Sequence, residues 1–439
     1  MDVLHAIGYT VGILFATVYL LEAYLQWRRR PLIKLMKSIR KIGRNMPVVG
    51  HIWLMWGKLE HALYTAEKLV RHYGQDGNFA VWIVDRVYVV LVKPEDLALT
   101  LGSPHFISKS TEYTIIGEKN RKLITPAFHF QILKTFIDNF HMESKILIDN
   151  VRNQMDNNGE VEVHRFIGLC TLDMITKNAM GVTVEAQKNS THVFQVTGER
   201  DTNNNADCGE TQDDGEEDAA LERVTCQLRD EVVTIMVGGQ ETTACENSFA
   251  ILMLALHQDV QRKVTTELAE IFGSDCRPPS YDDLQRMAYL ECVIKETMRL
   301  FPALPVMARV AQQNTTLSDN SFLPKGCTVV AFIYSLHRDP RYFPEPNRFW
   351  PERFLPENSG NRHPYSYIPF AAGARNCIGQ KYAMLQMKTI LSTMLREFRI
   401  LPSQNMPNMD SIRLLMTSTL RSKTGCWVRL QPRSSSSSA

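Results

Sequence analysis

The first strong pattern along the chain is an apolar run over residues 3–21, whose one ionisable side chain is His5. As a helix this run would reach roughly 28 Å, close to the hydrocarbon thickness of a bilayer. Residues 28–44 then carry eight Lys and Arg and no acid. A signal peptide needs a basic segment before the run and a small-residue cleavage site after it, and both are missing. The pattern therefore predicts a membrane anchor with the following chain in the cytosol.

The body of the chain is predicted to be mainly α-helical with small β-sheets. Two β-rich runs, residues 78–84 and 87–92, predict a hairpin around Asp85-Arg86. Beyond it, helical spacing dominates to about residue 300, with one long helix expected over residues 231–257. A capping box at residues 280–283 predicts a helix that ends before Pro302. Residues 382–398 are amphipathic, whereas the proline-rich residues 341–356 predict an extended coil.

Two further segments differ from this pattern. Residues 201–222 hold nine acidic side chains and no basic one, which predicts a solvated acidic loop. The serine-rich end predicts a disordered tail over residues 433–439. The expected organisation is an anchor over residues 1–27, a basic linker over 28–45 and a catalytic domain over 46–432 that includes the acidic loop.

Composition narrows the function classes. The formal net charge of +2 argues against a protein that binds nucleic acid through bulk positive charge. With 44% hydrophobic and 22% charged residues the chain has the composition of a globular protein. No two of its nine cysteines are separated by only two residues, which excludes a zinc ribbon and a thioredoxin-type motif. Scattered thiols in a chain this long indicate a reducing compartment.

One cysteine lies in a distinctive segment, FAAGARNCIG at residues 370–379. Cys377 just precedes a predicted helix, whose amino terminus favours a thiolate. Gly373 and Gly379 leave space for a flat group, and Arg375 offers a cation to a carboxylate. These residue types suit a haem whose iron is bound by the thiolate. A buried cysteine in a glycine-containing turn is an equally good reading of this segment alone.

Four motifs in order give the chain a resemblance to a known family. FAAGARNCIG matches the haem-binding motif of the cytochromes P450 throughout, including Phe370, Gly373 and Gly379. ETMR at residues 296–299, FWPERF at 349–354 and GGQETT at 238–243 resemble three further motifs of that family. Flanking phrases such as LITPAFHF and HRDPRYFPEPNRF resemble the family-four group and its insect relatives. The resemblance covers roughly residues 46–430 and implies the cytochrome P450 fold.

The resemblance implies roles for individual residues. Cys377 would be the axial ligand of the haem iron, with the haem between the cysteine-loop helix and the helix that carries GGQETT. Thr242 and Glu241 would help to deliver protons to bound dioxygen, Glu241 connecting to solvent. The remaining family positions fall into two groups: those expected to bind the haem propionates are Arg375, Arg309 and Arg121, and those expected to form a buried structural network are Glu296, Arg299 and Arg353.

The resemblance also implies an activity and partners. The expected protein is a haem-thiolate monooxygenase of the endoplasmic reticulum membrane that faces the cytosol. It would use O2, a lipophilic substrate such as a fatty acid or foreign compound, and electrons from an NADPH-dependent flavoprotein reductase. Membrane lipid is an expected partner and nucleic acid is not. Two alternatives stay open, namely a haem-thiolate isomerase or dehydratase, and a catalytically dead relative.

The chain departs from the family pattern in several places. Gly117 stands where the family has an aromatic residue four positions before Arg121. Gly238 stands where many family-four members carry a glutamate that can bond covalently to haem. The chain is also several dozen residues shorter than typical relatives, mainly before Gly117 and between about residues 186 and 229. These regions shape the substrate pocket, so the departures affect substrate binding more than haem binding.

Overall fold

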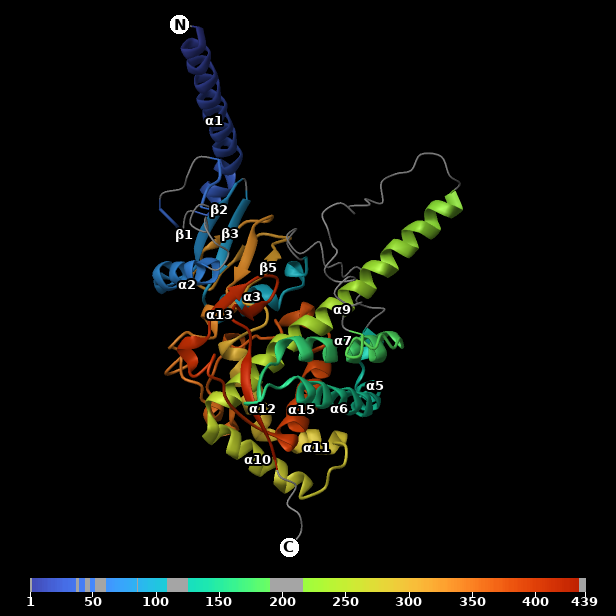
Figure 1. Cartoon of the computed structure of the whole chain (residues 1–439). Helices are drawn as coiled ribbons and strands as arrows, with labels where there is room; N and C mark the ends of the chain where they lie inside the picture. Colours follow the sequence, from blue (N-terminus) through green and yellow to red (C-terminus); the bar gives the residue numbers. More distant parts are fainter. Residues whose placement is uncertain are drawn as a thin grey trace.

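The computed structural model describes residues 2–36, 39–43, 48–51, 61–84, 86–108, 125–189 and 216–433, and about 56% of it is helical (Figure 1). Asp85, Gly117, Arg121, residues 201–215 of the acidic stretch and residues 434–439 of the expected tail lie outside the described residues. The helices are α1 (Asp2–Leu35), α2 (Ala62–Tyr73), α3 (Pro94–Leu101), α5 (Phe130–Thr135), α6 (Ile137–Gln154), α7 (His164–Met180), α9 (Glu216–Leu256), α10 (Gln258–Phe272), α11 (Tyr281–Arg286), α12 (Ala288–Leu300), α13 (Ile333–Leu336), α14 (Pro356–Ser359) and α15 (Gln380–Glu397).

Short 3-10 turns and strands complete the described elements. The turns are η3 (Gly74–Asp76), η4 (Pro104–Phe106), η6 (Thr125–Phe128), η7 (Pro351–Phe354), η8 (Pro364–Ser366), η9 (Gly373–Arg375) and η10 (Met409–Ser411). The strands are β1 (Arg40–Lys41), β2 (Phe79–Ile83), β3 (Arg86–Leu91), β4 (Glu160–Glu162), β5 (Met307–Val310), β6 (Thr315–Thr316), β7 (Phe322–Leu323), β8 (Thr328–Ala331), β9 (Phe398–Pro402), β10 (Leu414–Met416), β11 (Leu420–Ser422) and β12 (Trp427–Pro432). A mainly helical protein with small sheets was predicted, and the structure confirms it.

The strands form four small sheets. The largest has the order β1-β2-β3-β8-β5, and the others pair β4-β12-β9, β10-β11 and β6-β7. The predicted hairpin is the antiparallel pair β2-β3, in which Phe79 faces Val90. Its buried face is rich in β-branched and aromatic side chains, which suit a pleated surface. β5 brings Arg309 to the edge of this sheet, where it can reach the cysteine loop.

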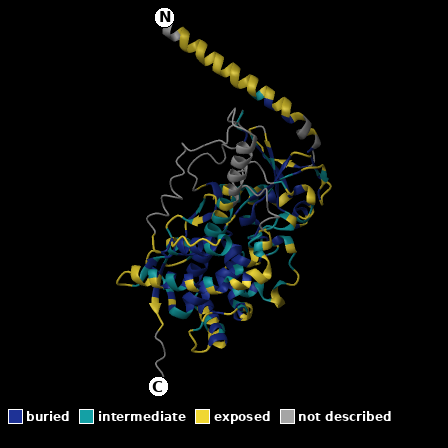
Figure 2. Ribbon diagram, turned by 90° about the vertical axis from the view of Figure 1, so that its right-hand side faces the viewer, coloured by how far each residue is buried: buried dark blue, intermediate teal, exposed yellow. Residues whose placement is uncertain are grey.

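Helix α1 continues beyond the expected anchor and into the expected basic linker. Its segment His5–Arg30 is long and apolar enough to cross a membrane, and residues 5–21 of it are exposed (Figure 2). The carboxyl-terminal part instead contacts the body of the protein. Val48 N donates to Glu22 Oε2 at 2.6 Å, and Arg29 Nη2 donates to Val84 O. Arg29 belongs to the basic segment, so its contact with the body helps to hold residues 28–35 in the helix. The sequence shows only repeated positive charge in this segment.

Helix α9 begins at Glu216, fifteen residues before the predicted start at residue 231. Residues 216–222 of the expected acidic loop therefore belong to this helix. Acidic residues are favourable in a first helical turn, and Ala, Leu and Glu are strong helix formers, so the start is physically reasonable. The carboxyl-terminal half of α9 runs through the interior, where residues 249–255 are almost completely buried. It packs there against α7, α12 and α15.

The single helix predicted after residue 280 is two helices. The capping box is confirmed, since Asp283 N donates to Ser280 Oγ and Ser280 N donates to Asp283 Oδ2. However, α11 ends at Arg286 and α12 starts at Ala288. Glu267 of α10 accepts hydrogen bonds from Tyr289 N and Leu290 N at 2.6 and 2.9 Å. The new helix start is thus capped by a side chain from another element, which local periodicity cannot reveal.

Candidate active site

The cysteine loop presents a thiol at the start of α15. Cys377 N donates to Phe370 O at 2.8 Å, which closes the loop, and Gly379 is the N-cap of α15 as predicted. Cys377 is exposed. Of the seven cysteines whose burial the structure describes, Cys276 is also exposed and the other five are buried. The reading of Cys377 as a buried core cysteine is therefore wrong.

The two glycines of the loop have different surroundings. Gly373 has φ +75°, and a Cβ there would lie 1.7 Å from Leu101 O, so the glycine is required for close contact with α3. Packing against α3 is therefore one reason for a glycine here, and the expected space for a flat group stays a prediction. A Cβ on Gly379 would lie 3.9 Å from Cys377 Sγ and 4.0 Å from Phe128. Gly379 thus borders the space around the thiol, as expected.

Two of the three expected propionate ligands lie together. Arg309 is buried in β5, and its Nη1 donates to Ala308 O at 2.9 Å. Its Nη2 donates to Arg375 O at 3.4 Å. The Arg309 guanidinium, from a distant part of the sequence, is thereby placed against the backbone of the cysteine loop at Arg375. Arg121 lies outside the described residues.

The adjacent glycines of α9 also serve different purposes. A Cβ on Gly239 would lie 2.6 Å from Ile175 Cγ1, so this glycine lets α7 and α9 pack closely. A Cβ on Gly238 would meet nothing within 4 Å. Thr242 Oγ1 donates to Gly238 O at 2.6 Å, one turn back, as predicted. Close helix packing, one explanation of a Gly-Gly pair, therefore applies to Gly239 and not to Gly238.

Glu241 is held by groups outside α9. Its Oε1 accepts from Arg421 Nε at 2.7 Å and from Thr419 Oγ1 at 2.9 Å. The Glu241 side chain is 14% exposed and that of Arg421 is 44% exposed, so the carboxylate meets solvent mainly through this arginine. Sequence reasoning missed Arg421 and Thr419, because no motif marks them and only the fold brings the β11 region to α9.

A second buried acid lies on the same helix. Glu246 follows Thr242 by four residues, so the two share a helix face. Its Oε1 accepts from Ala303 N at 2.7 Å, and no described residue bonds to its Oε2. Burial raises the pKa of Glu246 to about 8. Sequence reasoning missed this residue, although an acid inside the apolar end of a helix is a recognisable signal.

Glu296, Arg299 and Arg353 form a buried network. Their side chains are at most 2% exposed, which excludes a weak, solvent-exposed ion pair between Glu296 and Arg299. Arg299 donates to both carboxylate oxygens of Glu296, at 2.8 and 2.9 Å. Arg353 Nε donates to Glu296 Oε1 at 3.0 Å. The arginines also donate to carbonyl oxygens of the proline-rich coil, those of Pro344, Glu345, Pro346 and Arg348.

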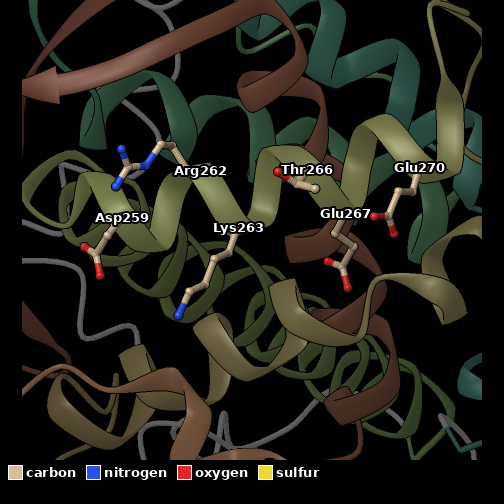
Figure 3. Close-up of a pocket in the computed structure, with 6 residues that line it drawn as sticks. All are labelled: Asp259, Arg262, Lys263, Thr266, Glu267 and Glu270. Carbon is tan, nitrogen blue, oxygen red and sulfur yellow. The ribbon is translucent and has the colours of Figure 1, made fainter.

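A hollow of about 450 Å³ on the surface of α10 lies elsewhere (Figure 3). Its lining is charged and polar, comprising Asp259, Arg262, Lys263, Thr266, Glu267 and Glu270. Lys263 Nζ bonds to Glu352, and Glu267 caps α12. These side chains therefore connect α10 to its neighbours, and a polar lining of this kind does not suit a lipophilic substrate.

The described residues around Cys377 fit a haem. A haem needs one soft axial ligand, space beside it and cations for its carboxylates. The exposed thiol of Cys377, the absence of a side chain at Gly379 beside it, and the Arg309 guanidinium at the cysteine loop provide these features. Together with the mainly helical fold, they match what a haem-thiolate oxidoreductase requires.

Comparison with known proteins specifies the family. The sequence profile of the cytochrome P450 family matches residues 117–203 and 209–424, and the chain belongs to this family. It is 33% identical to human cytochrome P450 4V2, over 91% of this chain and 90% of that protein. It is 31% identical to Drosophila melanogaster cytochrome P450 4c3, over 97% and 94%. The chain is accordingly a monooxygenase at the level of its family.

The same alignment bears on the length of the chain. The comparison with human cytochrome P450 4V2 extends over 479 positions, more than the 439 residues of this chain. Dozens of positions in that relative therefore have no counterpart here. The shortening expected from the sequence is therefore confirmed.

Proposed function

We propose that the protein is a membrane-anchored monooxygenase that hydroxylates a lipophilic small molecule, such as a fatty acid or a foreign compound. Its electrons come from NADPH through a flavoprotein reductase that docks on the basic face around the thiolate. The observation that carries the proposal is the exposed Cys377 thiol immediately before α15, in a loop whose Arg375 carbonyl oxygen accepts from the Arg309 guanidinium.

The proposed roles follow from the position of each side chain. Cys377 holds the haem iron, and Phe370 and Gly379 complete the loop around the thiolate. Arg309, Arg375 and Arg121 bind the propionates. When bound, haem with an axial thiolate supplies the activation of O2. Glu296, Arg299 and Arg353 keep the proline-rich coil fixed behind the loop.

Thr242 and Glu241 are proposed to supply protons. The Thr242 hydroxyl donates to Gly238 O, so its oxygen lone pairs are directed toward a donor such as water. Glu241 is fixed by Arg421 and Thr419 and exchanges protons with solvent through the exposed side of that contact. A hydroxyl and a carboxylate on successive residues can thus pass a proton from solvent toward the haem.

The proposed location is the endoplasmic reticulum membrane, with the catalytic domain in the cytosol. Helix α1 meets the length and composition needed for a span. The basic residues that follow the apolar run favour the cytosolic side. An anchor in the membrane also gives the active site access to lipophilic substrates, which partition into the bilayer.

The carbon monoxide difference spectrum of the reduced full-length protein tests the ligand assignment. We expect the strongly red-shifted band of a thiolate-bound haem, and we expect Cys377→Ser to abolish it. Cys276→Ser is the matched control, because the Cys276 thiol is also exposed. An imidazole-type spectrum, or an unchanged spectrum in Cys377→Ser, would refute the assignment.

Turnover experiments separate monooxygenase from isomerase activity. We expect a hydroxylated product from a fatty acid only with NADPH, reductase and O2 together. Conversion of a hydroperoxide without reductase, combined with no turnover under the first condition, would support the isomerase or dehydratase instead. Protein that fails to retain haem would support a catalytically dead relative.

A further inference from the structure

A cluster of three potential metal ligands lies on the side of α9 that faces α7 and β11. One ligand atom each of His164, Glu241 and Cys245 lies within 4.8 Å of the other two. We propose that these residues form a binding site for Zn²⁺, and that the bound ion inhibits the enzyme by removing the Glu241 carboxylate from proton delivery. The inhibitory part rests on the proposed function, whereas the binding part does not.

The backbone fixes the three ligands in place. Glu241 and Cys245 are four residues apart on α9, so they share one helix face. Cys245 Sγ lies 3.2 Å from Glu241 Oε1, a separation close to that of two ligands on one tetrahedral ion. His164 is the first residue of α7, and α7 packs closely on α9 at Gly239. Two rigid helices therefore define the distance between the ligands.

The imidazole of His164 has the tautomer that a metal ligand requires. Ser248 Oγ donates to Ala244 O at 2.6 Å, so its lone pairs are free to accept from His164 Nδ1, which is 3.1 Å away. That hydrogen bond leaves Nε2 without a proton. A histidine that binds a metal commonly donates its other N–H to a fixed partner in this way.

The charges of the cluster suit a divalent cation. The ion binds the Cys245 thiol as a thiolate and releases one proton to solvent, and no electron is transferred. A zinc-bound cysteine is deprotonated, so metal binding displaces the thiol proton of Cys245. Thiolate and carboxylate together then balance the charge of Zn²⁺. A thiolate, an imidazole and a carboxylate form a ligand set that favours zinc over magnesium or calcium.

Arg421 is the present counter-cation of Glu241 and competes with the metal. Its Nε donates to Glu241 Oε1, but its side chain is 44% exposed and can turn into solvent. A cavity of about 120 Å³ adjoins the cluster and has room for a water molecule as fourth ligand. It is lined by His164, Cys245, Ser248, Phe249, Arg421, Ser422, Gly425 and Cys426.

Zinc binding to the haem-loaded, full-length protein is tested first, without any turnover. One equivalent of Zn²⁺ is added after dialysis against a chelator, and zinc K-edge absorption reports the ligands. We expect one sulfur at about 2.3 Å together with nitrogen and oxygen ligands at about 2.0–2.2 Å. A shell of oxygen and nitrogen alone would overturn the site. An unchanged carbon monoxide spectrum shows that the zinc sulfur does not come from Cys377.

Variants distinguish a built site from a generally weakened protein. Cys245→Ala and His164→Ala should each weaken zinc binding at least tenfold, whereas Cys292→Ala, which removes a buried cysteine elsewhere, should not. Arg421→Gln should have the opposite effect and tighten binding severalfold, because it removes the competing cation. Equal affinity in all four variants, or weaker binding in Arg421→Gln, would overturn the proposal.

Inhibition is measured afterwards, each variant being compared with itself in the absence of zinc. Substrate turnover should fall with zinc occupancy in the unmodified protein and stay constant in Cys245→Ala. If zinc binds through the expected ligands but turnover is unaffected, the inhibitory role is refuted while the site stands. If the protein shows no monooxygenase activity at all, the proposed function fails, and the absorption experiment still decides the binding site.

Discussion

Adjacent residues of one helix can meet different constraints, as Gly238 and Gly239 show. Both cost helix stability relative to alanine, about 1 kcal/mol each. The space around them differs, because a Cβ would clash with Ile175 at Gly239 and would meet nothing at Gly238. The two glycines therefore provide a matched pair in which helix propensity is the same and packing is not.

We predict opposite effects of alanine at these two positions. Gly239→Ala should destabilise the protein by about 1–3 kcal/mol, because Ile175 has to move in a packed core. Gly238→Ala should be neutral or stabilising by up to about 1 kcal/mol. The temperature at which half of the carbon monoxide signal is lost measures both. A larger loss in Gly238→Ala than in Gly239→Ala would contradict this account of the packing.

Glu246 predicts a pH dependence of stability. Its pKa of about 8 in the folded protein lies above the ordinary value of 4.5, because burial penalises the charged form. Between pH 4.5 and pH 8 the Glu246 carboxyl therefore keeps its proton in the folded protein, whereas in the unfolded chain it has lost that proton. The stabilising contribution is complete below about pH 4.5 and is lost as pH rises through 8.

The measurement compares the unmodified protein with Glu246→Gln by denaturant unfolding from pH 5 to pH 8. Glutamine still accepts from Ala303 N but has no proton to lose. The stability of the variant relative to the unmodified protein should rise with pH, by at most on the order of 4 kcal/mol. Groups common to both proteins cancel in this difference. A difference that does not change with pH would show that Glu246 is not buried as a neutral acid.

At the scale of elements, a segment without regular structure is fixed by one helix. The proline-rich coil cannot form its own backbone ladder, since proline lacks an N–H and restricts its neighbours. Arg299 and Arg353 donate to carbonyl oxygens of the coil, and Glu296 accepts from Trp350 N at 2.8 Å. The coil is therefore as firmly positioned as a helix, although its hydrogen bonds are made with side chains.

We predict that this network tolerates little change. Glu296→Gln leaves two buried guanidinium groups without a countercharge and should cost about 3–5 kcal/mol. Glu345→Gln is the control, because the ion pair of Glu345 with Arg348 is exposed and should be worth less than about 1 kcal/mol. Thermal unfolding of haem-loaded protein compares the two. Similar losses in both variants would mean that the buried charges are not energetically coupled.

At the scale of the whole molecule, α1 has two functions along one continuous helix. Its apolar part is exposed and suits a bilayer, whereas its later part contacts the body through Glu22 and Arg29. Met36, directly after the helix, is buried. The basic residues that flank the apolar run are thus partly used in folding.

Two truncations should separate these functions. Deletion of residues 2–21 should abolish flotation with liposomes and leave the carbon monoxide spectrum intact. Deletion of residues 2–36 should also lower the yield of haem-loaded protein, because it uncovers Trp82 and Cys327, which pack near Arg29 and Met36. Equal yields of haem-loaded protein from both truncations would show that the later part of α1 does not stabilise the body.

Much of the fold and of the active-site chemistry could be predicted from local sequence. The apolar run, the β2-β3 hairpin, the capping box at Ser280 and the start of α15 each depend on neighbouring residues, and the structure confirms them. The position of Cys377 before a helix is likewise a local property. Short-range patterns determine these features because propensity, capping and periodicity act over a few residues.

Other features were decided by tertiary structure alone. The interruption at Met287 depends on Glu267 of another helix, and the requirement for Gly373 depends on Leu101 of α3. The partners of Glu241 come from the region of β11, 178 and 180 residues away. Sequence states which groups are present. Only the folded chain determines which of these groups meet and whether each is surrounded by solvent or by charge. The reason is that burial and pairing depend on residues that are close in space but distant in the sequence.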